Sequence, residues 1–415
     1  MIFEDIKLFK KWVEEKRSNF LNTREIESII NDIKEKGDKA VREYTKKFDN
    51  LELDFFEIKR EELIKISEKT DYNLKIAIEN AKNNIFEYHL LTKPKNWEYE
   101  KNGKTLGQIV KPIEKVGIYV PGGKGSYPST VLMTSIPAKI AGVKELIMVT
   151  PNITPAVAYA AISTGVDRVF RIGGVQAIAA LAFGTETIPK VFKIVGPGNK
   201  YVTLAKKYLY GYIDIDSIAG PSEVMLWVDE YVPLKYIVAD MFAQAEHSED
   251  AQAIVIVPSR EMADKLYSKI KQGLEESKRK DILKKSIENN SCIVIVEEPE
   301  TAIDLINYYA PEHLQIMTEE IEKDDVIKKI NNAGAIFYGK YTPVATGDYY
   351  AGPNHTLPTN GTAHFYSPLS VNNFVKTISY IEYSRDALQK DKKDITTLAE
   401  SEGFYEHANS IKIRE

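Results

Sequence analysis

From Val116 onward, short apolar runs alternate with helical patterns, and this alternation limits the possible folds more than any other feature of the sequence. The first series reads VGIYVP, TVLMTSIPAKIAGV, ELIMVT, AVAYAAISTG, QAIAALAFG, KVFKIVG and NKYVTLAKKYLYG; the second reads SEVMLWV, YIVADMFAQAEH, AIVIVP, EMADKLYSKIKQGLEE, SCIVIVE and GAIFYG. Strands without polar alternation, each followed by a helix, indicate a parallel sheet covered on both faces. The sequence therefore predicts an α/β chain with two doubly wound, incomplete Rossmann-like units.

The segments outside this alternation predict an N-terminal helical region and a C-terminal tail. One charged helix, TREIESIINDIKEKG, has Thr23 as a candidate N-cap and Gly37 as its stop. The later segment WEYEKNGKTLGQIV reads as a β-hairpin, because Asn102 and Gly103 supply the positive φ angles of a type I′ turn. The predicted N-terminal helical region, residues 1–115, is expected to pack with the second unit. The two α/β units are predicted at residues 116–221 and 222–367, and the tail at residues 368–415.

Composition excludes several classes of protein. The 415 residues are 43% apolar, which is enough for ordinary globular cores, and the formal charge of −5 argues against nucleic acid or an anionic membrane as partner. A small neutral or cationic partner fits better. The single cysteine, Cys292, excludes an intramolecular disulfide and is expected in a core strand. The N-terminal residues lack a signal-peptide apolar core, and no apolar run reaches the roughly 18 residues of a membrane span, so a cytoplasmic location is expected.

The polar stretch PVATGDYYAGPNHTLPTNGTAHFYS, residues 343–367, shows almost no apolar periodicity. It holds Asp348, His355 and His364 among glycines and prolines. Structureless segments of this length inside compact domains tend to bind or catalyse. We therefore expect this stretch to form one wall of a functional site.

Two glycine-rich turns follow predicted strands, in VGIYVPGGKGSYPST and in VGPGNK. Glycines there allow backbone amides to approach a phosphate at a helix N-terminus. The spacing of Gly122, Gly123 and Gly125 does not give GxGxxG, and no acidic residue clearly follows about 20 positions on. These turns could be purely structural or could bind the phosphates of a nucleotide, and their sequences do not distinguish the two.

Several polar side chains fall at spacings that suit a metal or acid-base chemistry. Asp240, Gln244 and His247 lie at spacings of four and three, on one face of a predicted helix, although a surface histidine is the plainer interpretation. Glu312 and His313 follow a proline and suit general acid-base work, although a lone Glu-His pair is common.

The histidines indicate a metal site only when they are considered together. Five of the six lie after residue 246; His89 is expected to be structural, and His407 could equally be a solvated residue of the tail. Nitrogen and oxygen donors without thiolates suit zinc or a similar divalent ion in a site open to substrate.

Longer segments resemble the histidinol dehydrogenase family. They are VGIYVPGGKGSYPSTVLM, GGVQAIAALAFGTETIPKVFKIVGPGNKYV, DSIAGPSEV, AQAEHSEDAQ, APEHLQI, GDYYAGPNHTLPT and EGFYEHANSIKIR, in the family's order from about residue 110 to the end. The resemblance implies oxidation of L-histidinol through L-histidinaldehyde to L-histidine, the last step of histidine biosynthesis. It also implies reduction of two NAD, one Zn²⁺ per site and a homodimer.

The resemblance implies roles for individual residues as well. The zinc ligands would be Gln244, His247, Asp348 and His407, and the acid-base pair would be Glu312 and His313. Substrate contacts would come from those ligands, His313, Ser222, His355 and Glu402, and NAD contacts from Tyr119, Gln176 and Asn199. The first unit would be the NAD side and the second would carry the metal and acid-base residues. The sequence departs locally from the family at KGSY, in the loop Gly122 to Tyr127 near NAD.

The chemistry of the substrate agrees with these roles. Histidinol carries an imidazole and an amine, so a zinc ion with an open position can orient it. His313 would take the hydroxyl proton as hydride leaves, and Glu312 would deprotonate the water that adds to the aldehyde. We further expect Glu402 and His407 of the tail to complete the site of a partner subunit. The alternatives are a zinc hydrolase or deaminase acting on a small heterocycle, and a non-catalytic metal-dependent binding protein.

Overall fold

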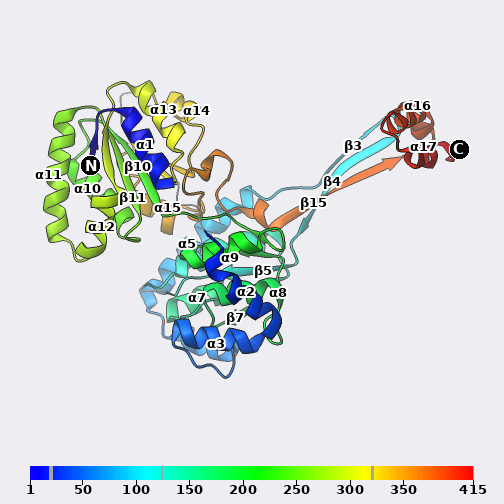
Figure 1. Cartoon of the computed structure of the whole chain (residues 1–415), viewed down its shortest axis with the longest axis horizontal. Coiled ribbons are helices and arrows are strands. Elements are labelled where there is room, and N and C mark those ends of the chain that lie inside the picture. The colour runs from blue at the N-terminus through cyan, green and yellow to red at the C-terminus, as the bar shows by residue number, and fades with distance from the viewer. Residues whose placement is uncertain (18–21, 123–124, 319–321, 415) are drawn as a thin grey trace.

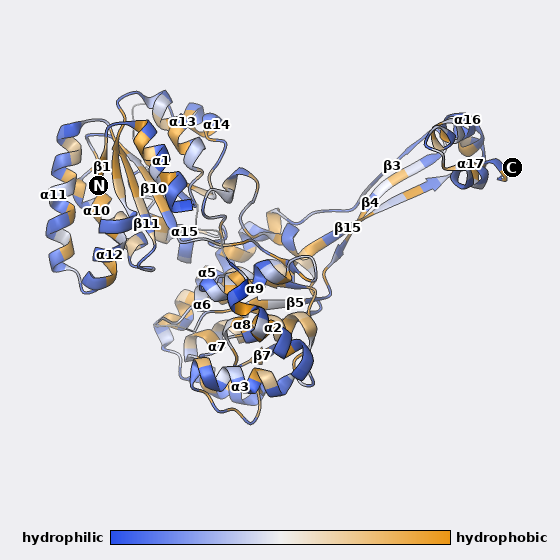
Figure 2. Cartoon of the chain, viewed as in Figure 1, coloured by the Kyte–Doolittle hydropathy of each residue, from blue (hydrophilic) through white to orange (hydrophobic). Residues whose placement is uncertain are grey.

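Two α/β lobes and one long arm make up the chain (Figure 1). The computed structural model describes residues 1–17, 22–122, 125–318 and 322–414. Both lobes have a six-stranded sheet at their centre, and Figure 2 shows the strands of these sheets as mostly hydrophobic. The predicted α/β class with two doubly wound units is confirmed.

The first lobe is built on the order β2-β7-β6-β5-β8-β9, in which only the short edge strand β2 is antiparallel to its neighbour. The strands are β2 (Glu57–Ile58), β5 (Lys115–Tyr119), β6 (Glu145–Val149), β7 (Arg168–Phe170), β8 (Lys193–Val195) and β9 (Asp214–Ile215). The connecting helices are α6 (Pro128–Ala141), α7 (Pro155–Ser163), α8 (Gly174–Phe183) and α9 (Lys200–Leu209). The sheet separates two apolar cores, as expected of a doubly wound unit.

The second lobe repeats this topology with a fully parallel order, β1-β12-β11-β10-β13-β14. Its strands are β1 (Ile2–Phe3), β10 (Glu223–Val228), β11 (Gln252–Val257), β12 (Cys292–Ile295), β13 (His313–Met317) and β14 (Ala335–Tyr338). Its helices include α10 (Leu234–Ala245), α11 (Arg260–Glu276), α12 (Lys280–Asn290), α13 (Pro299–Tyr309) and α14 (Lys323–Lys329). Cys292 is buried in β12, which confirms it as a core residue.

The N-terminal region is divided between the lobes, which differs from the prediction that it packs with the second unit. β1 and α1 (Ile6–Arg17) do join the second lobe, where Phe9 and Trp12 enter the core. The other helices pack on the first lobe: α2 (Arg24–Lys36), α3 (Asp38–Asp49), α4 (Arg60–Glu68) and α5 (Tyr72–Leu91). An apolar helix face shows that a helix is packed, but it does not show against which sheet.

The predicted hairpin is confirmed, and it forms part of a three-stranded antiparallel arm. β3 (Trp97–Lys101) and β4 (Lys104–Pro112) meet at Asn102 and Gly103, whose φ angles are 55° and 72°. The third strand, β15 (Val375–Tyr383), pairs with β4 over its whole length. At the tip, α16 (Arg385–Ser401) and α17 (Tyr405–Lys412) pack on each other, far from both lobes (Figure 1).

The polar stretch 343–367 contains more regular structure than predicted. Its beginning forms α15 (Val344–Tyr349), which carries Asp348, and a 3₁₀ turn follows at Thr362–His364; a second 3₁₀ turn, Val371–Phe374, leads into β15. In the glycine-rich turn VGIYVPGGKGSYPST, Gly123 lies outside the described residues. No helix in the described ranges is long and apolar enough to cross a membrane.

Candidate active site

A cavity of about 750 Å³ is lined by residues of both lobes. The first lobe contributes Gly125 and Tyr127, from the loop that follows β5. The second lobe contributes the end of α10, the start of α12 and α15, including Gln244, His247 and Asp348. Gln244 and His247 therefore face one space with Asp348, which is distant from them in the sequence, and with the glycine-rich loop of the other lobe.

Gln244, His247 and Asp348 have the donor atoms of a metal site. Gln244 lies in the last turn of α10 and is 2% exposed, and its Nε2 has no hydrogen-bond partner among the described residues; the amide oxygen is the atom that would bind a metal. His247 follows the helix, and desolvation lowers its pKa, so its imidazole is neutral at pH 7 with a lone pair for a metal. Within the described part of one chain, no three His, Cys, Asp or Glu side chains could hold a metal ion. An amide, an imidazole and a carboxylate fit zinc, but a further ligand is needed.

The pair Glu312 and His313 lies directly beside Asp348. His313 is the first residue of β13; its Nδ1 is 3.5 Å from Oε2 of Glu312 and its Nε2 is 3.4 Å from Oδ1 of Asp348. Burial raises the pKa of Glu312 to about 7, which suits an acid or base at neutral pH. Burial lowers the pKa of His313, but the carboxylates of Glu312 and Asp348 outweigh burial and raise it, which strengthens the imidazole as a base.

The structure places two predicted substrate contacts next to these residues. His355 lies within hydrogen-bond distance of the main chain of α15, with its Nδ1 2.9 Å from the carbonyl oxygen of Asp348. Ser222 precedes β10, and its neighbour Glu223 donates its main-chain N–H to Oε2 of Glu312 at 2.8 Å. Both therefore adjoin the acid-base pair or the proposed zinc ligands, while their contact with substrate stays a prediction.

The predicted NAD contacts are on the first lobe. Tyr119 ends β5, and its hydroxyl accepts a hydrogen bond from the N–H of Gly174 at 3.1 Å. Gln176, in α8, donates to Asp49 at 3.1 Å, and Asn199 caps the N-terminus of α9. Tyr119 ends β5 and Asn199 follows the neighbouring strand β8. The strand order reverses between these two strands, which is the usual nucleotide position in such sheets.

Close backbone approach at this point explains one glycine. The turn after β8 begins at Gly196, with φ of 114°, and a Cβ atom there would lie 2.3 Å from the carbonyl oxygen of Tyr119. Only glycine fits. Two side chains hold this turn in place. Asp216 accepts a hydrogen bond from the N–H of Gly196 at 2.7 Å. Lys206, which is ion-paired with Asp216, donates to the carbonyl oxygen of Gly196 at 3.0 Å.

Glu402 and His407 are not brought to this site by their own chain. Both are exposed residues of the arm tip, where Glu402 follows α16 and His407 lies in α17. The arm carries them far from both lobes (Figure 1). His364, in the 3₁₀ turn of the polar stretch, is also outside the cavity lining and has its Nε2 3.4 Å from the carbonyl oxygen of Tyr308.

Comparison with known proteins identifies the family. The family model described as histidinol dehydrogenase matches residues 14–415. The chain belongs to the histidinol dehydrogenase family. Histidinol dehydrogenase of Oceanobacillus iheyensis is 46% identical over 98% of this chain and 97% of its own length, and that of Clostridium acetobutylicum is 47% identical over 94% and 91%. A crystal structure of histidinol dehydrogenase from Elizabethkingia anophelis has a TM-score of 0.94 at 34% identity, covering 100% of this chain and 97% of that one.

Sequence reasoning did not select two buried residues that adjoin the histidinol dehydrogenase site. They are Glu223, at the start of β10, and Tyr309, at the end of α13. A signal for Glu223 was available, because it is the one charged residue in the apolar run SEVMLWV. Asp240, which shares a helix face with Gln244, instead accepts a hydrogen bond from Gln315 at 2.7 Å.

Proposed function

We propose that this chain is a zinc-dependent histidinol dehydrogenase that oxidises L-histidinol through L-histidinaldehyde to L-histidine and reduces two NAD. The observation that carries the proposal is the juxtaposition of Gln244, His247 and Asp348 at one cavity, with His313 3.4 Å from Asp348. Family membership supplies the substrate, since the matched relatives are histidinol dehydrogenases.

The residues of this chain fit an oriented alcohol oxidation. Zinc, when bound, would supply a positive centre that orients the imidazole and amine of histidinol. NAD supplies the hydride acceptor. His313 is the base that takes the hydroxyl proton, because its imidazole is buried beside two carboxylates that increase its proton affinity.

The aldehyde step requires a water rather than a thiol. Cys292 is buried in β12, and burial raises the pKa of its thiol to about 12, so it is not a thiolate nucleophile. Glu312 has a pKa of about 7 because of its burial, and it is the group that removes a proton from the water that adds to the aldehyde carbon. After His313 has released the first proton to solvent, it receives the hydroxyl proton of the hydrated aldehyde as the second hydride leaves for the second NAD.

We infer that the site is shared between two copies of the chain. Gln244, His247 and Asp348 leave the metal one ligand short, while His407 and Glu402 stand exposed at the tip of an arm that points away from both lobes (Figure 1). Exposed apolar side chains on the arm, including Ile378, Ile381 and Phe404, agree with a partner surface.

The proposal is tested by incubating the protein with L-histidinol, NAD and zinc, and by counting NADH against histidine. Two NADH per histidine are expected. A zinc hydrolase or deaminase acting on a heterocycle would release product without absorbance at the NADH band. A chain that binds zinc and leaves NAD oxidised with histidinol present would refute the proposal.

A further inference from the structure

One residue contacts both members of the acid-base pair through its main chain. The N–H of Glu223 donates to Oε2 of Glu312 at 2.8 Å, and the carbonyl oxygen of Glu223 is 3.1 Å from Nδ1 of His313. The pairing of β10 with β13 brings these residues together, because Val224 is in register with His313. A small shift of the first residue of β10 would therefore move both reacting groups.

These contacts orient the imidazole ring of His313. The two nearest oxygens to Nδ1, the carbonyl of Glu223 and the carboxylate of Glu312 at 3.5 Å, can only accept when Glu312 is ionised. An N–H on Nδ1 therefore donates to one of these two oxygens and holds the ring in place. The other ring nitrogen, Nε2, then faces the carboxylate of Asp348, with Oδ1 3.4 Å away.

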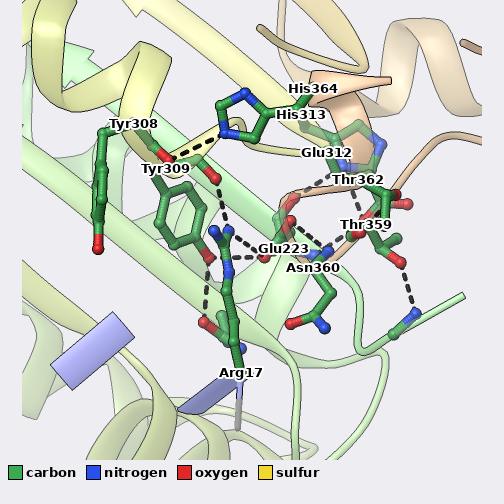
Figure 3. Close-up of polar contacts among 12 residues, drawn as sticks. Arg17, Glu223, Tyr308, Tyr309, Glu312, His313, Thr359, Asn360, Thr362 and His364 are labelled. Carbon is green, nitrogen blue, oxygen red and sulfur yellow. Dashed lines mark hydrogen bonds and ion pairs between the residues drawn. The ribbon is translucent and has the colours of Figure 1, made fainter. Parts of the chain in front are cut away.

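The side chain of Glu223 is held from several directions (Figure 3). It is 1% exposed; the hydroxyl of Tyr309 donates to its Oε2 at 2.7 Å and the N–H of Asn360 to its Oε1 at 2.9 Å. Arg17, from the end of α1, lies 3.9 Å from the same carboxylate and donates to the carbonyl oxygen of Tyr309 at 2.5 Å. Three segments that are distant in the sequence converge on this one carboxylate.

Stability alone is a weak reason for such an arrangement. Removing a carboxylate from water is costly, and apolar side chains of similar volume can often replace a buried ion pair without loss of stability. The neighbouring residues of β10 are all apolar, so an apolar residue would fit the pattern of the strand. The contacts instead connect Asn360, in the segment that also carries Asp348 and His355, with β10, whose first residue contacts the acid-base pair.

We propose that Glu223 is a positioning residue for the acid-base pair: its main chain orients the carboxylate of Glu312 and the ring of His313, and its carboxylate, bound by Tyr309, Asn360 and Arg17, keeps that main chain in place. This inference rests on the proposed function, in which His313 is the base. Glu223 itself does not need to touch the substrate.

The test compares two adjacent tyrosines. Tyr309→Phe removes the hydrogen bond to Glu223, whereas Tyr308→Phe is a matched control, because the hydroxyl of Tyr308 contacts Lys10 and Glu14 on α1 instead. In single turnovers with histidinol, Tyr309→Phe is expected to form the first NADH about tenfold more slowly, the loss typical of a hydrogen bond to a charged group. Its zinc content and KM for histidinol should stay near wild type, and Tyr308→Phe should remain within about twofold.

A double-mutant cycle separates positioning from a general loss of structure. If Glu223 acts through His313, Tyr309→Phe should lower the residual rate of His313→Asn by less than about twofold. Glu223→Gln, which keeps the size of the side chain, should repeat the pattern even if Tyr309→Phe folds poorly. Full rates in both variants, or the same tenfold loss in the His313→Asn background, would overturn the inference. If the wild-type protein forms no NADH from histidinol, the proposed function itself has failed.

Discussion

Mixing two inactive variants should restore activity if the arm of one chain completes the site of another. His313→Asn removes the proposed base in the second lobe, and His407→Ala removes the proposed fourth zinc ligand, which the arm carries away from its own lobes (Figure 1). Each homodimer has the same defect at both sites and should be nearly inactive. Removal of a general base typically costs ~10²- to 10⁴-fold in turnover.

The size of the recovery follows from twofold symmetry. After the two variants are unfolded, mixed in equal amounts and refolded, half of the dimers should contain one chain of each kind. In a mixed dimer, one site combines the His313→Asn lobe with the His407→Ala arm and has both defects. The other site combines the intact lobe with the intact arm. One working site in half of the dimers gives about a quarter of wild-type activity.

A second pair of variants provides the control. Gln244 and His313 both belong to the second lobe, so mixing Gln244→Ala with His313→Asn leaves one defect at every site and should restore nothing. NADH formation is followed after both mixtures have been refolded in parallel with wild type. Recovery in neither mixture, with wild type refolding normally, would show that each arm serves its own chain.

Three further outcomes are expected. His313→Asn should keep wild-type zinc content while its turnover falls by roughly 10²- to 10⁴-fold, and metal analysis showing lost zinc would make His313 a ligand. Cys292→Ala should oxidise histidinaldehyde at near wild-type rate, since the thiol is buried in β12; loss of only the aldehyde step would contradict the water route. His89 is buried, which lowers its pKa from 6.5 to about 4, so the unfolded chain takes up a proton first as pH falls. The contribution of His89 to the free energy of unfolding should therefore be complete above about pH 6.5 and should decrease toward pH 4 by up to ~3 kcal/mol. Urea unfolding at several pH values measures this decrease, which should be smaller in His89→Gln.

Local patterns in the sequence were enough for the parts of the fold that depend on neighbours along the chain. Asn102 and Gly103 predict their hairpin because few residues tolerate positive φ at both positions. Cys292 is predicted to be buried because its strand is apolar throughout. The two α/β units follow in the same way, since strands buried on both faces have a pattern of their own.

The tertiary structure decided which distant segments meet. The N-terminal helices show apolar faces, but only the packing in the structure assigns α1 to one lobe and α2 to α5 to the other. The reason is that the hydrophobic effect is non-directional, so an apolar helix face can be buried against either sheet. The hairpin gives no sign of its third strand, β15, which arrives more than 260 residues later. Nε2 of His313 and Oδ1 of Asp348 are 3.4 Å apart, although the two residues belong to different elements, β13 and α15. The contacts of Glu223 also depend on the tertiary structure. Residues of α1, α13 and the polar stretch all contact it, and the spacing of these segments along the chain does not predict that they meet.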